Sequence, residues 1–156
     1  MAYNMKDVFY LDTAIDTNST NTRAAVLDLS SYVDPISRGR AKGTGLAIYK
    51  VHFDICDDDG NSPVAAAATG QFRAGLMSIT GLTSGTVSLD SNTLNASNDL
   101  MIAGVDFAAG GTAAGDPAPH MFLEPSEDVP YVVVRDQVTL IVNPITAMSA
   151  EASVKV

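Results

Sequence analysis

Polar and apolar side chains alternate along several short stretches of this chain. The two clearest are Leu46–Ile55 and the last ten residues, Ala147–Val156. A period of two is the pattern of a half-buried β-strand, and no stretch shows a convincing helical period. The alternation predicts these interior positions: Tyr49, Val51, Phe53, Ile55, Val138, Leu140, Val142, Val154 and Val156.

Further short apolar runs predict additional strands between turn signals. They are Val8–Leu11, Ala24–Leu29, Phe72–Thr80, Thr86–Leu89, Leu100–Phe107, His120–Leu123, Pro130–Val134 and Val138–Asn143. Gly104, inside one of these runs, predicts a bulge or a close approach of two chain segments. Ala108–Pro119, rich in Gly, Ala and Pro, reads as a long loop.

About eight to ten short strands separated by turn signals are typical of β-sandwiches and barrels. We therefore predict an all-β fold, an antiparallel two-sheet β-sandwich, and among such folds we favour a jelly roll. The length of 156 residues fits a single domain, 1–156, that buries a sizeable core. Hydrophobic residues make up 46% and aromatic residues only 6%, so this core is expected to consist mainly of small side chains.

Charge limits the partners that the chain can have. The net charge is −9, and residues 52–156 carry thirteen acidic residues against three basic ones. This part should repel nucleic acid and anionic membranes, so we expect no strong nucleic-acid binding. Arg38, Arg40 and Lys42 form a basic cluster, which is either a solvated loop or a loop that contacts a phosphate or a neighbouring subunit.

Only 17% of the residues are charged, below the roughly 25% that is usual for soluble domains. Two explanations stay open: a surface rich in Ser, Thr and Asn, or a surface that a partner covers. The start of the chain lacks the basic and apolar regions of a signal peptide, and no apolar run is long enough to span a membrane. We expect a chain that is made in the cytoplasm and has no transmembrane segment.

The sequence contains few candidates for metal binding or catalysis. The acidic turn Asp57, Asp58 and Asp59 fails the EF-hand pattern, because Ala68 stands where the twelfth-position glutamate is required. Those three aspartates are only weak calcium candidates, and we predict no metal and no cofactor. His52 and His120 have no metal-binding partner at a suitable spacing. Cys56 stands alone beside the acidic turn, which would raise the pKa of its thiol and make it a poor nucleophile. We predict that the protein is not an enzyme.

The order of features resembles a known family. Leu27–Val33 is followed by the basic cluster, then by Leu46–Ile55, a series of small strands, and the closing pair Val138–Val142 and Ser149–Val156. This order is similar to that of the single jelly-roll capsid proteins of tailless icosahedral viruses. The resemblance implies two sheets built from eight strands, assembly of copies through sheet edges and loops, and no catalytic residues. The chain lacks the long basic arm of many such proteins, which suggests a shell that lines a membrane or a genome neutralised by something else.

Three functions from different classes remain open. The first is a self-assembling structural subunit of a viral capsid or similar shell, located in the virion, with itself and other shell proteins as partners. The second is a decoration, fibre or surface-adhesion module, and the third is a monomeric β-sandwich that binds a ligand or carbohydrate. For the first, the predicted subunit contacts are Val8, Phe9, Tyr10, Leu11, Arg38, Arg40, Lys42, Ala108, Gly110 and Gly111.

Overall fold

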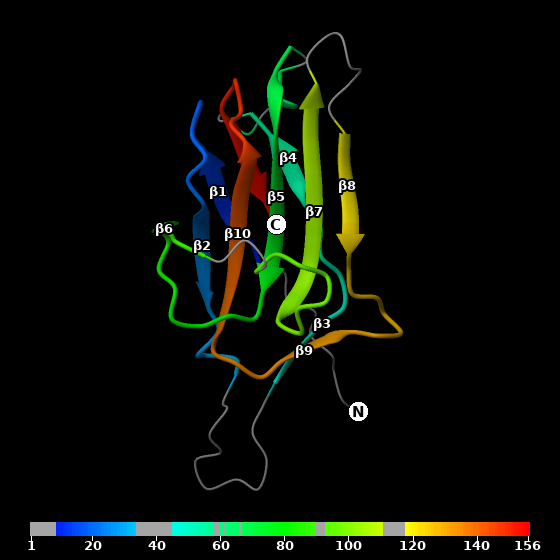
Figure 1. The fold of residues 1–156 in the computed structure, drawn as a ribbon. Coiled ribbons are helices and arrows are strands. Elements are labelled where there is room, and N and C mark those ends of the chain that lie inside the picture. The colour runs from blue at the N-terminus through cyan, green and yellow to red at the C-terminus, as the bar shows by residue number, and fades with distance from the viewer. Residues whose placement is uncertain are drawn as a thin grey trace, which may run out of the picture.

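The computed structural model describes residues 9–33, 45–57, 60, 62–65, 67–89, 93–110 and 118–156 (Figure 1). These residues form strands and no helix, which confirms the prediction of an all-β fold. The strands are β1 (Asp12–Ile15), β2 (Arg23–Asp28), β3 (Leu46–Ile48), β4 (Asp54–Cys56), β5 (Thr69–Met77), β6 (Gly85–Thr86), β7 (Met101–Gly110), β8 (Ala118–Leu123), β9 (Tyr131–Val133), β10 (Gln137–Thr146) and β11 (Ala152–Lys155).

These strands form antiparallel sheets that pack in two layers. The larger sheet has the order β6-β2-β10-β5-β7-β8, and a three-stranded sheet has the order β1-β11-β4. A two-stranded sheet pairs β3 with β9. In Figure 1, β1 and β4 lie behind the six-stranded sheet, and β1 contacts β2 and β10 across the interface between the layers. The predicted antiparallel β-sandwich is confirmed.

The pairing of the strands is nested along the chain. The first strand, β1, pairs with the last, β11, and β2 pairs with β10. Inside these, β3 pairs with β9 and β5 pairs with β7. The chain is therefore one long antiparallel ribbon that is closed at β5–β7. The ribbon folds over on itself, because β10 also pairs with β5 and β11 with β4.

The six-stranded sheet is apolar on both faces. Consecutive residues of a strand point to opposite faces, and Leu140 and Ile141 of β10, both fully buried, belong to two separate apolar clusters. The larger cluster, which we call the inner core, fills the space between the two layers. Phe72 and Phe107 stack at its centre, with ring centroids 5.0 Å apart. The smaller cluster lies on the outer face of the same sheet.

The interior positions predicted from alternation are correct in part. Five of them are buried: Val51, Val138, Leu140, Val142 and Val154. Phe53, Ile55 and Val156 are only partly buried, and Tyr49 is 42% exposed, so its assignment to the interior was wrong. The cause is that Leu46–Ile55 is not one strand. The chain passes from β3 to β4, which belong to different sheets, and one alternating pattern cannot keep a single face inward across that change.

Two other boundaries differ from the sequence prediction for reasons of pairing. β7 continues through Ala108 to Gly110, because these residues pair with Thr69–Gln71 of β5. The loop predicted from Ala108 therefore begins later. β10 continues past Pro144, which pairs with Phe72 just before an irregularity in the register. Proline cannot donate to a sheet ladder, so an irregularity beside it is the expected accommodation.

Gly104 confirms the prediction of a bulge and a close approach. The register between β7 and β8 shifts between Gly104 and Val105. The ring of Phe122 on β8 lies against Gly104, so closely that a Cβ atom there would collide with it. An aromatic ring covering a glycine on a neighbouring strand stabilises a sheet where the glycine itself contributes no packing.

Candidate interaction surfaces

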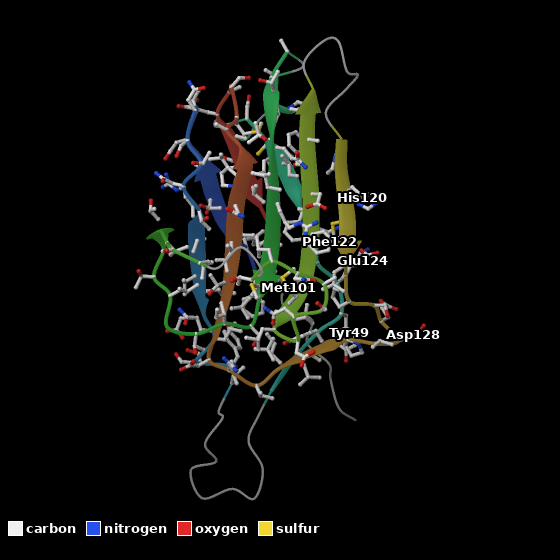
Figure 2. All side chains as sticks on the ribbon, in the orientation of Figure 1. Tyr49, Met101, His120, Phe122, Glu124 and Asp128 are labelled. Carbon is white, nitrogen blue, oxygen red and sulfur yellow. The ribbon has the colours of Figure 1, made fainter. Side chains whose placement is uncertain are left out.

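Exposed apolar side chains gather at one end of the sandwich. Within the described part of the chain, the exposed large hydrophobic residues are Tyr10, Tyr32, Tyr49, Val129, Val132, Val134 and Ile145. All of these except Ile145 belong to segments at or next to the β3–β9 pair, and we call these six residues the apolar end. Figure 2 labels Tyr49 at this end of the molecule, and Figure 1 shows β3 and β9 below the body of the sandwich.

Backbone and ring contacts tie the parts of the apolar end together. Tyr32 packs edge-to-face against Phe9, with centroids 5.2 Å apart, which brings the N-terminal segment and Tyr10 beside it. The Leu29 N–H donates to the carbonyl oxygen of Asp136 at 2.7 Å, so the turn holding Tyr32 lies next to the short connection between β9 and β10. Residues far apart in sequence thus form one region.

The centre of this region is the outward face of the β3–β9 pair. Val133 is fully buried, whereas its neighbours Val132 and Val134 are 57% and 59% exposed. Ala47 of β3, directly opposite Val132, is exposed as well. A Cβ atom on Gly45 would lie 3.4 Å from Val132 and 3.6 Å from Val134, so all four residues share a face. Exposed apolar side chains that adjoin one another on one face make a candidate contact surface.

Strand β9 also has an open edge. It pairs with β3 alone among the described strands, so none of them occupies its other edge. An unpaired edge presents backbone donors and acceptors to any strand that can approach. Exposed charged residues of both signs, Lys50, Asp128 and Arg135, lie in the segments next to the valines. An apolar centre with a polar rim is the arrangement of protein interfaces.

The contact residues predicted from sequence fall in different places. Tyr10 is 80% exposed and belongs to the apolar end, and Phe9 and Leu11 pack against the inner core. Leu11 extends the β1–β11 pairing by exchanging two backbone hydrogen bonds with Val156. Ala108 and Gly110 are exposed at the far end of β7, away from β9 (Figure 1). The other predicted contacts, Val8, Arg38, Arg40, Lys42 and Gly111, lie outside the described residues.

The structure offers no assembled metal site within its described part. No group of three His, Cys, Asp or Glu side chains able to hold an ion occurs among the described residues. The Asp57 carboxylate accepts the Ser62 N–H at 3.4 Å, whereas Asp58 and Asp59 lie outside the described residues. His52 and His120 are both exposed, and His120 lies opposite Asp106 on the neighbouring strand.

Cys56 is a buried thiol in surroundings that lower its nucleophilic reactivity. It is 4% exposed, and its S–H points to the Ser153 carbonyl oxygen at 3.7 Å. Burial raises the pKa of the Cys56 thiol above its ordinary value, and the negative charges of Asp54 and Asp57 add to this effect, with Lys155 opposing it. Since the thiolate is the reactive form, this environment disfavours a nucleophilic role.

The raised pKa of Cys56 predicts a pH dependence of stability. The folded state favours the protonated thiol, so its contribution to stability is complete below the unfolded thiol pKa of about 9.0 and is lost as the pH rises through the folded pKa. Urea unfolding between neutral and alkaline pH should show this loss for the unaltered chain. The decline should be shallower in Cys56→Ala. An identical decline in both proteins would contradict the assignment.

Comparisons of the chain with protein-family models, with curated proteins and with solved structures found no match. A search of the described residues for a helix long and apolar enough to cross a membrane found none.

Proposed function

We propose that this protein is a jelly-roll subunit that assembles with copies of itself into a capsid or similar shell, and that in a virus it would belong to the virion. The nested pairing of β1 with β11, β2 with β10, β3 with β9 and β5 with β7 supports the jelly roll. In that fold an antiparallel ribbon of eight strands wraps into two sheets through Greek-key connections. Three further strands lie at sheet edges: β6 and β8 extend the larger sheet, and β4 is an edge strand of the three-stranded sheet.

The apolar end is the observation that carries the assembly proposal. Val132 and Val134 expose more than half of their surface beside the open edge of β9. Leaving such a surface in water forgoes about 25 cal/mol for each Å² of apolar area that a neighbour would cover. An open apolar edge is also an aggregation hazard unless a partner occupies it. A second copy in a closed arrangement removes both problems.

The test is the size of the particles that the purified chain and its variants form. We expect sedimentation velocity to show large assemblies of the unaltered protein, far above the monomer mass of 16.3 kDa. Val132→Lys combined with Val134→Lys should shift the protein to small species, because two charges cannot be buried in the contact without partners. The variant should still fold, with an unchanged β-sheet circular-dichroism spectrum, since both side chains face solvent in the single chain.

Ile145→Lys is the matched control. Ile145 is 55% exposed, like the two valines, but belongs to β10 and not to the apolar end. Its replacement should leave the assemblies intact. Equal effects of the valine and isoleucine variants would show that any exposed apolar residue matters and that the apolar end has no special role.

A further inference from the structure

The outer face of the six-stranded sheet carries a second, separate apolar cluster. Its buried members are Ala24, Met77, Leu94, Met101 and Ile141, none of which belongs to the inner core. Residues 78–89 and 93–100 cover this face and cross in front of the lower part of the sheet in Figure 1. Because the two clusters share no buried residue, the outer one can be uncovered without breaking the inner one.

Residues 93–100 form a small turn that holds its own shape, and we call it the Asn turn. The Asn98 side-chain amide donates to the Thr93 carbonyl oxygen at 3.0 Å. The Asn95 carboxamide oxygen accepts the Ser97 N–H at 3.0 Å. Local side-chain bonds of this kind stabilise a turn independently of its surroundings.

The Asn turn rests on a glycine and covers a methionine. Leu94, 6% exposed, lies over Gly75, where a Cβ atom would come within 2.9 Å of the leucine side chain. The methyl group of Met101 would be 3.0 Å from the same Cβ position. Gly75 therefore allows Leu94 and Met101 to pack side by side against the sheet, and Met101 is only 4% exposed.

Among the described residues, three hydrogen bonds attach the Asn turn to the sandwich. The Arg73 Nη1 donates to the Leu94 carbonyl oxygen at 3.1 Å, and the Tyr131 hydroxyl donates to the Asp99 carbonyl oxygen at 2.8 Å. At the end of the turn next to β7, the Ser78 N–H donates to the Leu100 carbonyl oxygen at 2.8 Å. Arg73 is itself held in place by three interactions. Its Nε and Nη2 donate to the two carboxylate oxygens of Asp106 at 2.6 and 2.8 Å, and its guanidinium lies 4.4 Å from the Phe122 ring centroid.

We propose that the Asn turn opens as a unit while the sandwich stays folded, and that Arg73 is the latch that keeps it closed. Segments with few buried contacts and self-contained hydrogen bonds open at lower free energy than core strands. Asp106 and Phe122 orient the guanidinium, and an N–H of its Nη1 reaches the turn. The open state uncovers Met101 and an apolar strip of β5 and β7, a surface that the closed state hides.

Methionine oxidation reports this opening directly. Hydrogen peroxide transfers one oxygen atom to an accessible thioether, giving methionine sulfoxide and water. Met101 lies under the Asn turn, whereas Met148, fully buried, belongs to the inner core and serves as the internal control. In the unaltered full chain, peptide mass spectrometry should show Met101 oxidised well before Met148.

Arg73→Lys should raise the oxidation rate of Met101 by about tenfold and leave that of Met148 unchanged. Lysine keeps the positive charge but cannot bind both carboxylate oxygens of Asp106 and also reach the Leu94 carbonyl oxygen. The loss of one charge-assisted hydrogen bond corresponds to about a tenfold change in the opening equilibrium. Arg23→Lys is the matched control. Arg23 also pairs with an aspartate, Asp16, at 2.7 Å, and its side chain is 30% exposed against 35% for Arg73. The Arg23 Nη1 donates to Asp16 and not to the Asn turn.

Two results would overturn the proposal. One is equal oxidation of Met101 and Met148 in the unaltered chain, and the other is an equal increase for both in Arg73→Lys, which would indicate global unfolding. If Arg73→Lys does not fold, hydrogen exchange of the unaltered protein tests the same opening of the Asn turn. The Asn98 and Met101 amides donate to carbonyl oxygens of the turn. Their exchange rates should report local opening and should therefore stay constant at low denaturant concentrations. Exchange at the rate of global unfolding would contradict it.

Discussion

Replacing Gly70 with alanine is expected to destabilise the protein by about 3–5 kcal/mol, the sum of backbone strain and overpacking. Gly70 has φ +127°, which L side chains rarely adopt. A Cβ atom there would also lie 2.7 Å from the Met148 Cα and 2.8 Å from the Ala147 carbonyl oxygen, and backbone atoms cannot move aside cheaply. This contact is where the connection between β10 and β11 crosses the start of β5, and Ser149 donates its N–H to the Thr69 carbonyl oxygen beside it at 2.8 Å.

Gly85→Ala separates the two contributions to the Gly70 effect. Gly85 has nearly the same φ, +123°, but a Cβ atom there meets nothing within 4 Å. Its replacement should cost only the strain, about 1–2 kcal/mol. Chemical denaturation of both variants measures the difference. Equal losses would mean that the crossing at Met148 yields easily and does not help to define the sandwich.

Truncating Phe72 to alanine is expected to cost about 3–5 kcal/mol, the range for fully buried aromatic residues. Phe72 has no exposed surface and stacks on Phe107, so its removal leaves a cavity between the layers. Phe53, which the alternation placed in the interior, is only partly buried. Phe53→Ala should therefore cost less, under about 2 kcal/mol, because the apolar area returned to water is smaller.

Urea unfolding of the two phenylalanine variants checks the position of the core. A larger loss for Phe53→Ala than for Phe72→Ala would contradict the assignment of Phe72 and Phe107 to its centre.

The sequence prediction was correct where a local pattern determines the structure, and it failed where pairing between distant segments does. Val138, Leu140 and Val142 were placed correctly because β10 is a continuous apolar run inside one sheet. Leu46–Ile55 was predicted as one strand because alternation is a local signal. The chain changes from one sheet to another within this range because β3 pairs with β9 and β4 pairs with β11, and both partners are distant in the sequence.

Long-range pairing also explains why β7 extends beyond its predicted end at Phe107. Ala108–Gly110 form strand because Thr69–Gln71 pair with them, although glycine and alanine have low β-propensity.

The candidate interface was foreseen only at Tyr10. Its centre, Val132 and Val134, was visible in the sequence as part of the predicted strand Pro130–Val134. The pattern alone did not show which face of that strand would be left uncovered. That depends on where β3 and β9 lie relative to the other strands, which is a property of the whole fold.

Negative-stain imaging of the purified chain at micromolar concentration tests assembly into a shell. We expect closed particles of uniform size for the unaltered protein and their loss when Val132 and Val134 are both changed to lysine. Trimers or filaments would instead favour a fibre or decoration module. Isolated particles of the 16.3 kDa monomer alone would contradict assembly and favour a ligand-binding sandwich.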